Sequence, residues 1–281
     1  MNMNAQSKAV VPAPDVPGTN ETSSVVRRPV LAQRKGRGRL GGSRFLDLLV
    51  QRARAANRRV KVLDGDLRSR TLAEIYPAVD LSGKPVRDGA SCPTSEELPD
   101  MKTWLFEQLD AMAEDRVSRV LDLGGGDRVM QEFVRELPIS TFCDDMGIDL
   151  VSLYMLGPDP EDFRHVREVI KAEGGDTTKI VLVLNEGVIR VGQSVVGVFD
   201  PLLLHPDMNA LIEDGARVSM FRRLSCMEVV QASGQSYYDI VRGVPGAGGQ
   251  KQRPTTQHMV RVWLERFEAE FVQNEVGVLL P

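Results

Sequence analysis

The sequence predicts an α/β fold, in which a mostly parallel β-sheet carries helices on both faces in three layers. Short apolar segments that end in turn residues alternate with amphipathic segments of helical spacing, which is typical of strand–helix–strand units. A chain of 281 residues is long enough for one large α/β domain. Aromatic residues make up only 5% of it, so aliphatic side chains must build the core.

The strands are predicted from six short apolar runs that are bounded by turn residues. The second run ends in the turn-like sequence Asp64-Gly65-Asp66, and the third ends in Asp122, which is soon followed by three glycines. Residues 81–99, rich in Pro, Gly, Ser and Asp, are expected to form a loop or hairpin. The predicted strands cover residues 28–33, 59–64, 117–122, 149–155, 179–185 and 216–221.

The main helices are predicted from apolar residues that recur at helical spacing. The first of them follows the glycine-rich stretch 34–43 directly, and the third is stopped by Gly174-Gly175. In the last helix, Met259 is expected to point inward together with its apolar neighbours. The predicted helical segments are 45–53, about 100–114, 160–173 and 255–272.

The chain is expected to have an unstructured start and one folded domain. Residues 1–26 show no hydrophobic period and predict a disordered tail, and residues 27–281 are predicted to form a single domain. The start lacks the features of a signal peptide, and no segment is long and apolar enough for a membrane span. The widely spaced Cys92, Cys143 and Cys226 indicate neither a disulfide framework nor a zinc site. A cytoplasmic location is therefore expected.

Positive charge is concentrated near the start of the predicted domain. The formal net charge is only -4, which excludes the strong positive field of a dedicated nucleic-acid binder. Between Arg27 and Lys61, however, 12 Arg and Lys residues stand against a single acid, Asp47. Such a run forms either a solvated surface or a site for anions, and the sequence leaves both interpretations open.

The glycine-rich stretch carries a phosphate-binding pattern with one departure. Residues 36–43 match G-x-x-x-x-G-K-[ST], except that Gly42 stands where the lysine belongs. The stretch lies between a predicted strand and a predicted helix, where backbone N–H groups can wrap a phosphate. Ser43 keeps the hydroxyl that binds magnesium, and Arg39 and Arg44 are candidate substitutes for the missing lysine. A flexible basic turn is the alternative interpretation.

Acidic residues are predicted to lie close to this loop. Ligands of a parallel sheet bind at the carboxyl ends of its strands. The second strand ends in Asp64 and Asp66, and the third ends in Asp122. Carboxylates beside a hydroxyl group suit magnesium. The sequence therefore predicts a site for magnesium and a polyphosphate at this edge.

Four segments resemble motifs of the deviant Walker ATPases, the P-loop family of ParA and MinD. The loop resembles the K-G-G-x-G-K-[ST] motif, with Arg37 in place of the signature lysine and Arg39 in place of a glycine. Within the family, the chain looks most like conjugal transfer proteins of the TraL type and partition-type ATPases. The other resembling segments are the D-x-D motif at residues 62–68, the D-x-x-G switch at 120–126 and the adenine-contacting strand that ends in Asn185.

The resemblance implies a P-loop NTPase-like fold with ATP and Mg²⁺ as ligands, and it implies a role for each matching residue. Arg37 would reach the phosphates across a nucleotide-sandwiched homodimer, and Asp66 would orient the attacking water, so these two are the candidate catalytic residues. Ser43 and Asp122 would hold the metal ion with the support of Asp64. The implied nucleotide-binding residues are Gly36, Gly38, Arg39, Gly41, Gly42, Ser43 and Asn185.

The resemblance also implies a role in plasmid partition or conjugative transfer, with non-specific DNA or a plasmid-encoded protein as partner. Two alternatives stay open. The missing lysine is compatible with a pseudo-ATPase, whose basic loop binds DNA or a protein without hydrolysis. The glycines Gly36, Gly38 and Gly41 also satisfy the dinucleotide pattern G-x-G-x-x-G, although two acidic strand ends beside a hydroxyl favour magnesium over a ribose.

Overall fold

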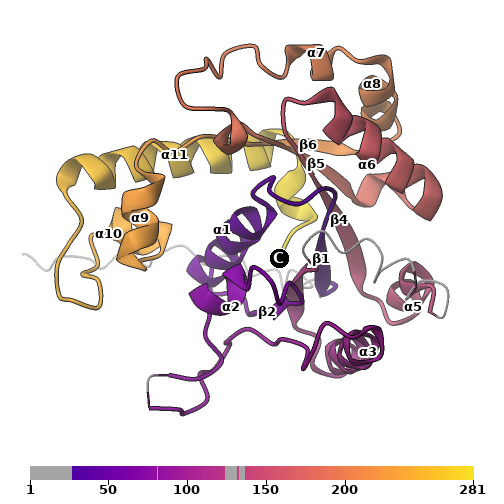
Figure 1. Cartoon of the computed structure of the whole chain (residues 1–281), viewed down its shortest axis with the longest axis horizontal. Helices are drawn as coiled ribbons and strands as arrows, with labels where there is room; N and C mark the ends of the chain where they lie inside the picture. The colour runs from indigo at the N-terminus through magenta and orange to yellow at the C-terminus, as the bar shows by residue number, and fades with distance from the viewer. Residues whose placement is uncertain (1–26, 81, 124–131, 133–136) are drawn as a thin grey trace, which may run out of the picture.

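A parallel sheet forms the centre of the molecule (Figure 1). The computed structural model describes residues 27–80, 82–123, 132 and 137–281. The predicted tail and the glycines after Leu123 lie outside these ranges. The six strands are β1 (Val30–Lys35), β2 (Val60–Asp64), β3 (Ser118–Asp122), β4 (Asp149–Leu156), β5 (Ile180–Asn185) and β6 (Arg217–Phe221). Their order is β2-β3-β1-β4-β5-β6, and every neighbouring pair is parallel.

Helices cover both faces of this sheet. The longer ones are α1 (Gly42–Ala55), α3 (Leu98–Asp115), α6 (Pro160–Glu173), α8 (Pro206–Glu213) and α11 (Pro254–Gln273), and the shorter ones are α2 (Thr71–Ile75), α5 (Ile139–Asp145), α7 (Asp200–Leu203), α9 (Met227–Ser233) and α10 (Tyr237–Arg242). On one face, α1, α10 and α11 pack against alternate strand residues such as Leu153. On the other face, α3 and α5 cover one half of the sheet, and α6 and α8 cover the half that includes Tyr154. The predicted three-layer α/β/α fold is confirmed.

Strand β1 occupies the position on which the site depends. It lies in the middle of the sheet, between β3 and β4. The chain passes from β1 to one side of the sheet and later from β3 to the other side, so the strand order reverses next to β1. At such a point the loops at the carboxyl ends of the strands diverge and leave room for a ligand. The segment after β1 therefore has the placement expected of a P-loop.

Two details of the predicted elements differ from the structure. Strand β1 continues past the predicted end at residue 33 through Arg34 and Lys35, which are only 5% and 7% exposed. In α11, Val260 and Trp263 are buried as predicted, but Met259 is 39% exposed. The inward placement of Met259 is wrong because this side chain lines an open groove beside the residues that follow β6.

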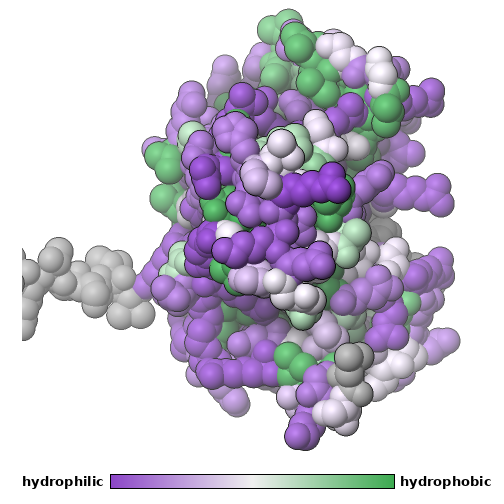
Figure 2. Space-filling model, turned by 90° about the vertical axis from the view of Figure 1, so that its left-hand side faces the viewer, coloured by the Kyte–Doolittle hydropathy of each residue, from purple (hydrophilic) through white to green (hydrophobic). Residues whose placement is uncertain are grey.

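The surface is largely hydrophilic on the face shown in Figure 2, with apolar residues gathered at its top. The segment between β5 and α8 contributes several exposed apolar side chains, among them Val191 (99% exposed), Val196 (86%) and Leu204 (76%). Within the described ranges, no helix combines the length and the apolar character needed to cross a membrane.

Strand β3 carries an arginine into the protein interior. The Arg119 side chain is 1% exposed, and its Nη1 and Nη2 atoms lie 3.1 and 3.2 Å from the carboxylate oxygens of Asp115. The Nζ atom of Lys61 donates to the same carboxylate at 2.7 Å. Burial by itself would raise the pKa of Asp115, but the hydrogen bonds from Arg119 and Lys61 lower it to about 2.

This ion pair predicts a specific loss of stability in acid. A carboxyl group whose pKa is lowered by folding contributes stability above its unfolded pKa of about 4, and the contribution disappears as the pH falls to about 2. We expect Asp115→Asn to lower the free energy of unfolding by about 2 kcal/mol at pH 7 and to flatten its decline in acid. Urea unfolding at several pH values measures both effects. The exposed Asp110→Asn is the control, and a decline equal to that of the wild type would contradict the prediction.

Candidate functional site

Residues 36–41 connect β1 to α1 in a tight loop that is held in place from β5. Asn185 Nδ2 donates to the Leu40 carbonyl oxygen at 2.7 Å, and Asn185 Oδ1 accepts from the Gly187 amide at 2.7 Å. Gly41 caps α1 with a φ of 77°, and a Cβ atom there would lie 2.4 Å from Asn185 Nδ2. Glycine is therefore required at position 41 both for the backbone conformation and for this close approach.

The N-terminus of α1 is suited to bind an anion. Its Gly41 cap makes no side-chain hydrogen bond, and its first turn contains no acidic residue. The first amide groups of a helix have no partners within the helix, and they carry a partial positive charge. Phosphate groups bind at helix ends of this kind. The loop thus keeps the backbone part of a phosphate site.

The side chain of Arg34 lies inside the loop. A Cβ atom added to Gly42 would lie 2.4 Å from Arg34 Nε, 2.7 Å from its Cγ and 2.9 Å from its Cδ. The guanidinium group donates from Nη2 to the Arg37 carbonyl oxygen at 2.8 Å, and Nη1 lies 3.7 Å from Asp122 Oδ1. The space beside Gly42, from which a P-loop lysine would extend, is thus occupied by an arginine that comes from β1.

This arrangement brings two positive groups together. The Arg34 guanidinium lies beside the positive end of α1, and Asp122, which is 1% exposed, lies against the guanidinium. The substitutes suggested by the sequence lie elsewhere, since Arg39 is exposed and Arg44 lines a separate cavity with Asp47. Arg34 was missed because it was expected to lie beyond the strand. The glycine at position 42 was the sequence signal that could have indicated this, because another buried side chain must fill the space beside a glycine.

Ser43 and Asp122 meet as predicted. Ser43 Oγ donates to Asp122 Oδ2 at 2.5 Å. The hydroxyl is in the first turn of α1 and the carboxylate ends β3, so the pair joins the loop to the neighbouring strand. A hydroxyl and a carboxylate are hard oxygen ligands, and Mg²⁺ commonly binds to one or two such groups while phosphates and water complete its shell. These two residues fit a magnesium ion.

The other predicted acids are engaged with the backbone. Asp64 Oδ1 accepts from the Asp66 amide at 3.1 Å, and Asp64 Oδ2 accepts from the Ala73 amide at 2.8 Å. Burial raises the pKa of Asp64, and the nearby Asp122 carboxylate adds to this effect. Asp66 Oδ1 accepts from the amides of Arg68 and Ser69. In the described part of the chain, no group of three or more Asp, Glu, His or Cys side chains is arranged to hold a metal ion.

The remaining predicted residues take different positions around the loop. Arg37 points away from it, with Nη1 3.0 Å from Asp162 Oδ1 in the first turn of α6. Gly36 has a φ of 93°, and Gly38 is exposed with open space around it. Asn185, predicted to contact adenine, holds the loop through its Nδ2 atom, while its Oδ1 atom accepts from the amide of Gly187, which follows β5.

No protein-family model and no curated protein matches the chain. Among solved structures, a MinC:MinD cell division protein complex of Aquifex aeolicus is similar at 11% identity and a TM-score of 0.46, over 84% of this chain and 96% of that one. The MinD cell division protein of Aquifex aeolicus is similar at 12% identity and a TM-score of 0.41, over 85% of this chain and 97% of that one. Chloroplast FtsY of Physcomitrella patens is similar at 15% identity and a TM-score of 0.36, over 57% of this chain and 50% of that one.

Arg34 and Gly42 are predicted to depend on each other. Gly42→Ala places a methyl group where the Arg34 side chain lies, and it should destabilise the protein by about 1–3 kcal/mol, as overpacking of buried sites does. In an Arg34→Ala background the same change should cost much less, because the space is vacated. Denaturant unfolding of the four proteins gives the coupling free energy, which we expect at about 1 kcal/mol or more.

The matched control for this cycle is Gly38→Ala. Nothing lies within 4 Å of a Cβ atom at position 38, so this change should have the same small effect with and without Arg34. Purely additive effects of the substitutions at positions 34 and 42 would show that the two side chains do not share this space.

Proposed function

We propose that this chain is a nucleotide-binding protein of the ParA/MinD type, which binds ATP with Mg²⁺ and uses Arg34 as the cation of its phosphate loop. The meeting of the Arg34 guanidinium with the uncapped N-terminus of α1 supports this most strongly. Two positive groups that lie this close together favour a ligand with several negative charges. A polyphosphate has that charge, and the loop offers it backbone amides.

In this proposal each group has a distinct task. The amides of the loop and of the first turn of α1 wrap the phosphates. The guanidinium of Arg34 turns from the Arg37 carbonyl oxygen to the phosphate oxygens, where its planar fork can form two hydrogen bonds. Ser43 and Asp122 hold Mg²⁺, which neutralises phosphate charge when bound. Asn185 keeps the loop in shape.

A second candidate function is nucleotide binding without hydrolysis. Arg37 is paired with Asp162, and Asp66 Oδ1 accepts from backbone amides, so both predicted catalytic residues are engaged by other groups. Rearrangement on binding, or a contribution from a second copy, is required for hydrolysis. The cellular role that we infer from the sequence resemblance is plasmid partition or conjugative transfer in the cytoplasm, with DNA or a plasmid-encoded protein as partner.

The nucleotide proposal is tested by titration of the full chain with ATP and Mg²⁺ in a calorimeter. We expect the wild type to bind and Arg34→Ala to bind about 10- to 100-fold more weakly, because one charged hydrogen-bonding group contributes about 1.5–3 kcal/mol. Arg34→Lys should recover part of the affinity because it keeps the charge. The exposed Arg261→Ala is the control. Equal affinity of the wild type and Arg34→Ala would refute the role of Arg34, and phosphate release by the wild type would refute the candidate without hydrolysis.

The exposed apolar residues after β5 support a homodimer as part of the same proposal. Val191 and Val196 follow the strand whose end holds the loop, and their side chains are almost fully exposed. Burial of such side chains stabilises association. We expect ATP and Mg²⁺ to shift the chain towards dimers in analytical ultracentrifugation, and Val191→Asp with Val196→Asp to abolish the shift. Val272→Asp, at a position 75% exposed at the end of α11, should leave it unchanged.

A further inference from the structure

A cluster of arginines lies at the edge of the sheet that is opposite the loop. Arg27 and Arg28 precede β1, Arg58 and Arg59 precede β2, and Arg116 precedes β3. Because the strands are parallel, these three starts meet at one edge. The five side chains line a pocket of about 290 Å³, closed in part by Leu280 and Pro281. We call it the arginine pocket.

Neutral groups hold several of these guanidinium groups in place. Arg116 donates to the carbonyl oxygens of Met146 at 2.5 Å and Gly147 at 2.8 Å. Arg27 Nη2 donates to the Val278 carbonyl oxygen at 2.6 Å. Carbonyl oxygens satisfy N–H donors but carry no net charge. These bonds therefore fix the guanidinium groups and leave their positive charge uncompensated.

Acidic groups compensate little of this charge. The lining of the arginine pocket contains no Asp or Glu among the residues that the structure describes, and its negative group is the terminal carboxylate of Pro281. In the same part of the chain, the one ion pair of these five arginines joins Arg28 Nη1 to Asp149 Oδ1 at 3.7 Å. That Asp149 oxygen also binds Lys179 Nζ at 2.9 Å. The five positive charges are thus set against two carboxylates, that of Asp149, which also binds Lys179, and the terminal carboxylate of Pro281.

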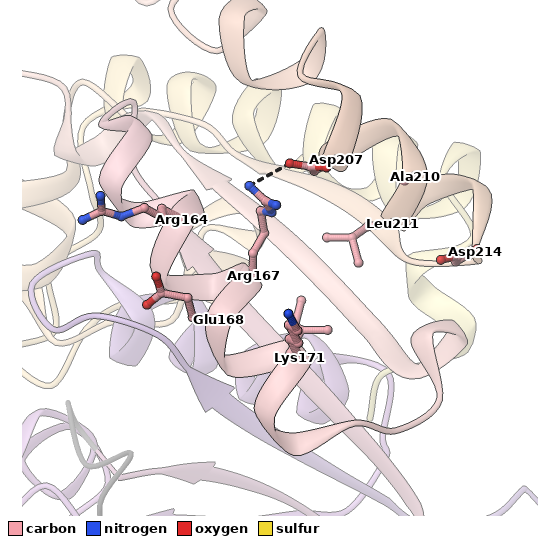
Figure 3. A pocket seen from close by; sticks show the side chains of 9 residues that line it. Arg164, Arg167, Glu168, Lys171, Asp207, Ala210, Leu211 and Asp214 are labelled. Atoms are coloured by element: carbon pink, nitrogen blue, oxygen red, sulfur yellow. Dashed lines mark ion pairs between the residues drawn. The ribbon is translucent and has the colours of Figure 1, made fainter.

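The groove between α6 and α8 shows the opposite case (Figure 3). It is also lined by positively charged side chains, but acidic side chains lie between them. Arg167 Nη1 lies 2.7 Å from Asp207 Oδ2. The positive and negative side chains of this groove compensate each other, so it needs no ionic ligand. The charged residues that line it are Arg164, Arg167, Glu168, Lys171, Asp207 and Asp214.

The environment of Arg58 shows that it is unfavourable to bring these arginines together. Its pKa is lowered by burial and further by the nearby positive charges of Arg52 and Arg27. Its Nε atom is buried, and no described residue accepts a hydrogen bond from it. A buried donor without an acceptor is unfavourable. An anion in the pocket would relieve the repulsion among these arginines.

We propose that the arginine pocket binds a small anion with a phosphate group, about the size of inorganic pyrophosphate. Guanidinium groups bind phosphate oxygens through paired, charge-assisted hydrogen bonds. An anion held by arginines from three segments would tie together the starts of β1, β2 and β3. The site is separate from the nucleotide loop, so the proposal does not rest on the function proposed above.

Calorimetric titration of the full chain with inorganic pyrophosphate tests the proposal. We expect Arg58→Gln with Arg59→Gln to weaken binding by about tenfold or more, because two charged donors are lost. The exposed pair Arg87→Gln with Arg261→Gln is the control and should bind as the wild type does, and Arg34→Ala should keep the arginine-pocket binding. If Arg34→Ala abolishes binding and the double variant at 58 and 59 keeps it, the anion binds in the loop and the proposal is overturned.

Thermal unfolding gives an independent test. Without a phosphate anion, the double variant at 58 and 59 should be at least as stable as the wild type, because like charges are removed. Pyrophosphate should raise the melting temperature of the wild type and raise that of the variant much less. Equal increases would overturn the proposal. Binding of a short DNA duplex without binding of pyrophosphate would also overturn it, since an extended surface would then replace the pocket.

Discussion

The close packing of the Arg34 side chain against Gly42 is the constraint on which the site depends. The guanidinium group reaches the loop from β1 because position 42 has no side chain, and it is held there by the Arg37 carbonyl oxygen and Asp122. Asp122 in turn accepts from Ser43 at the start of α1. One buried arginine therefore links the loop, the helix and the neighbouring strand. It also leaves a positive group where a P-loop needs one.

The parallel sheet makes this arrangement possible. Arg34 is on β1, Asp122 ends β3 and Asn185 ends β5, and residues so far apart in the chain meet because parallel strands end at one edge. The same geometry collects the starts of three strands at the other edge, where the arginine pocket lies. The two sites differ in whether backbone groups take part in binding. The loop offers the amides of a helix N-terminus, whereas the arginine pocket relies on side chains alone.

The sequence predicted the sheet, the layers and the meeting of Ser43 with Asp122, because burial of both faces of parallel strands leaves continuous apolar runs and their ends gather at one edge. It did not predict Arg34. An arginine next to glycines is typical of a solvated turn, and its burial depends on Asp122, which is distant in the sequence. It also did not predict that the amides of residues 66 and 73 occupy the Asp64 carboxylate, because turn geometry after a strand depends on packing around it.

The central claim is that Arg34 carries the charge of the missing lysine. A crystal structure of the chain with a non-hydrolysable ATP analogue and Mg²⁺ tests it most directly, through the distances from the Arg34 guanidinium nitrogens to the phosphate oxygens. The account predicts that the guanidinium leaves the Arg37 carbonyl oxygen and lies within hydrogen-bond distance of the β- or γ-phosphate, with the metal ion at Ser43 and Asp122. An analogue bound in the loop while Arg34 stays against Asp122 and touches no phosphate would contradict it.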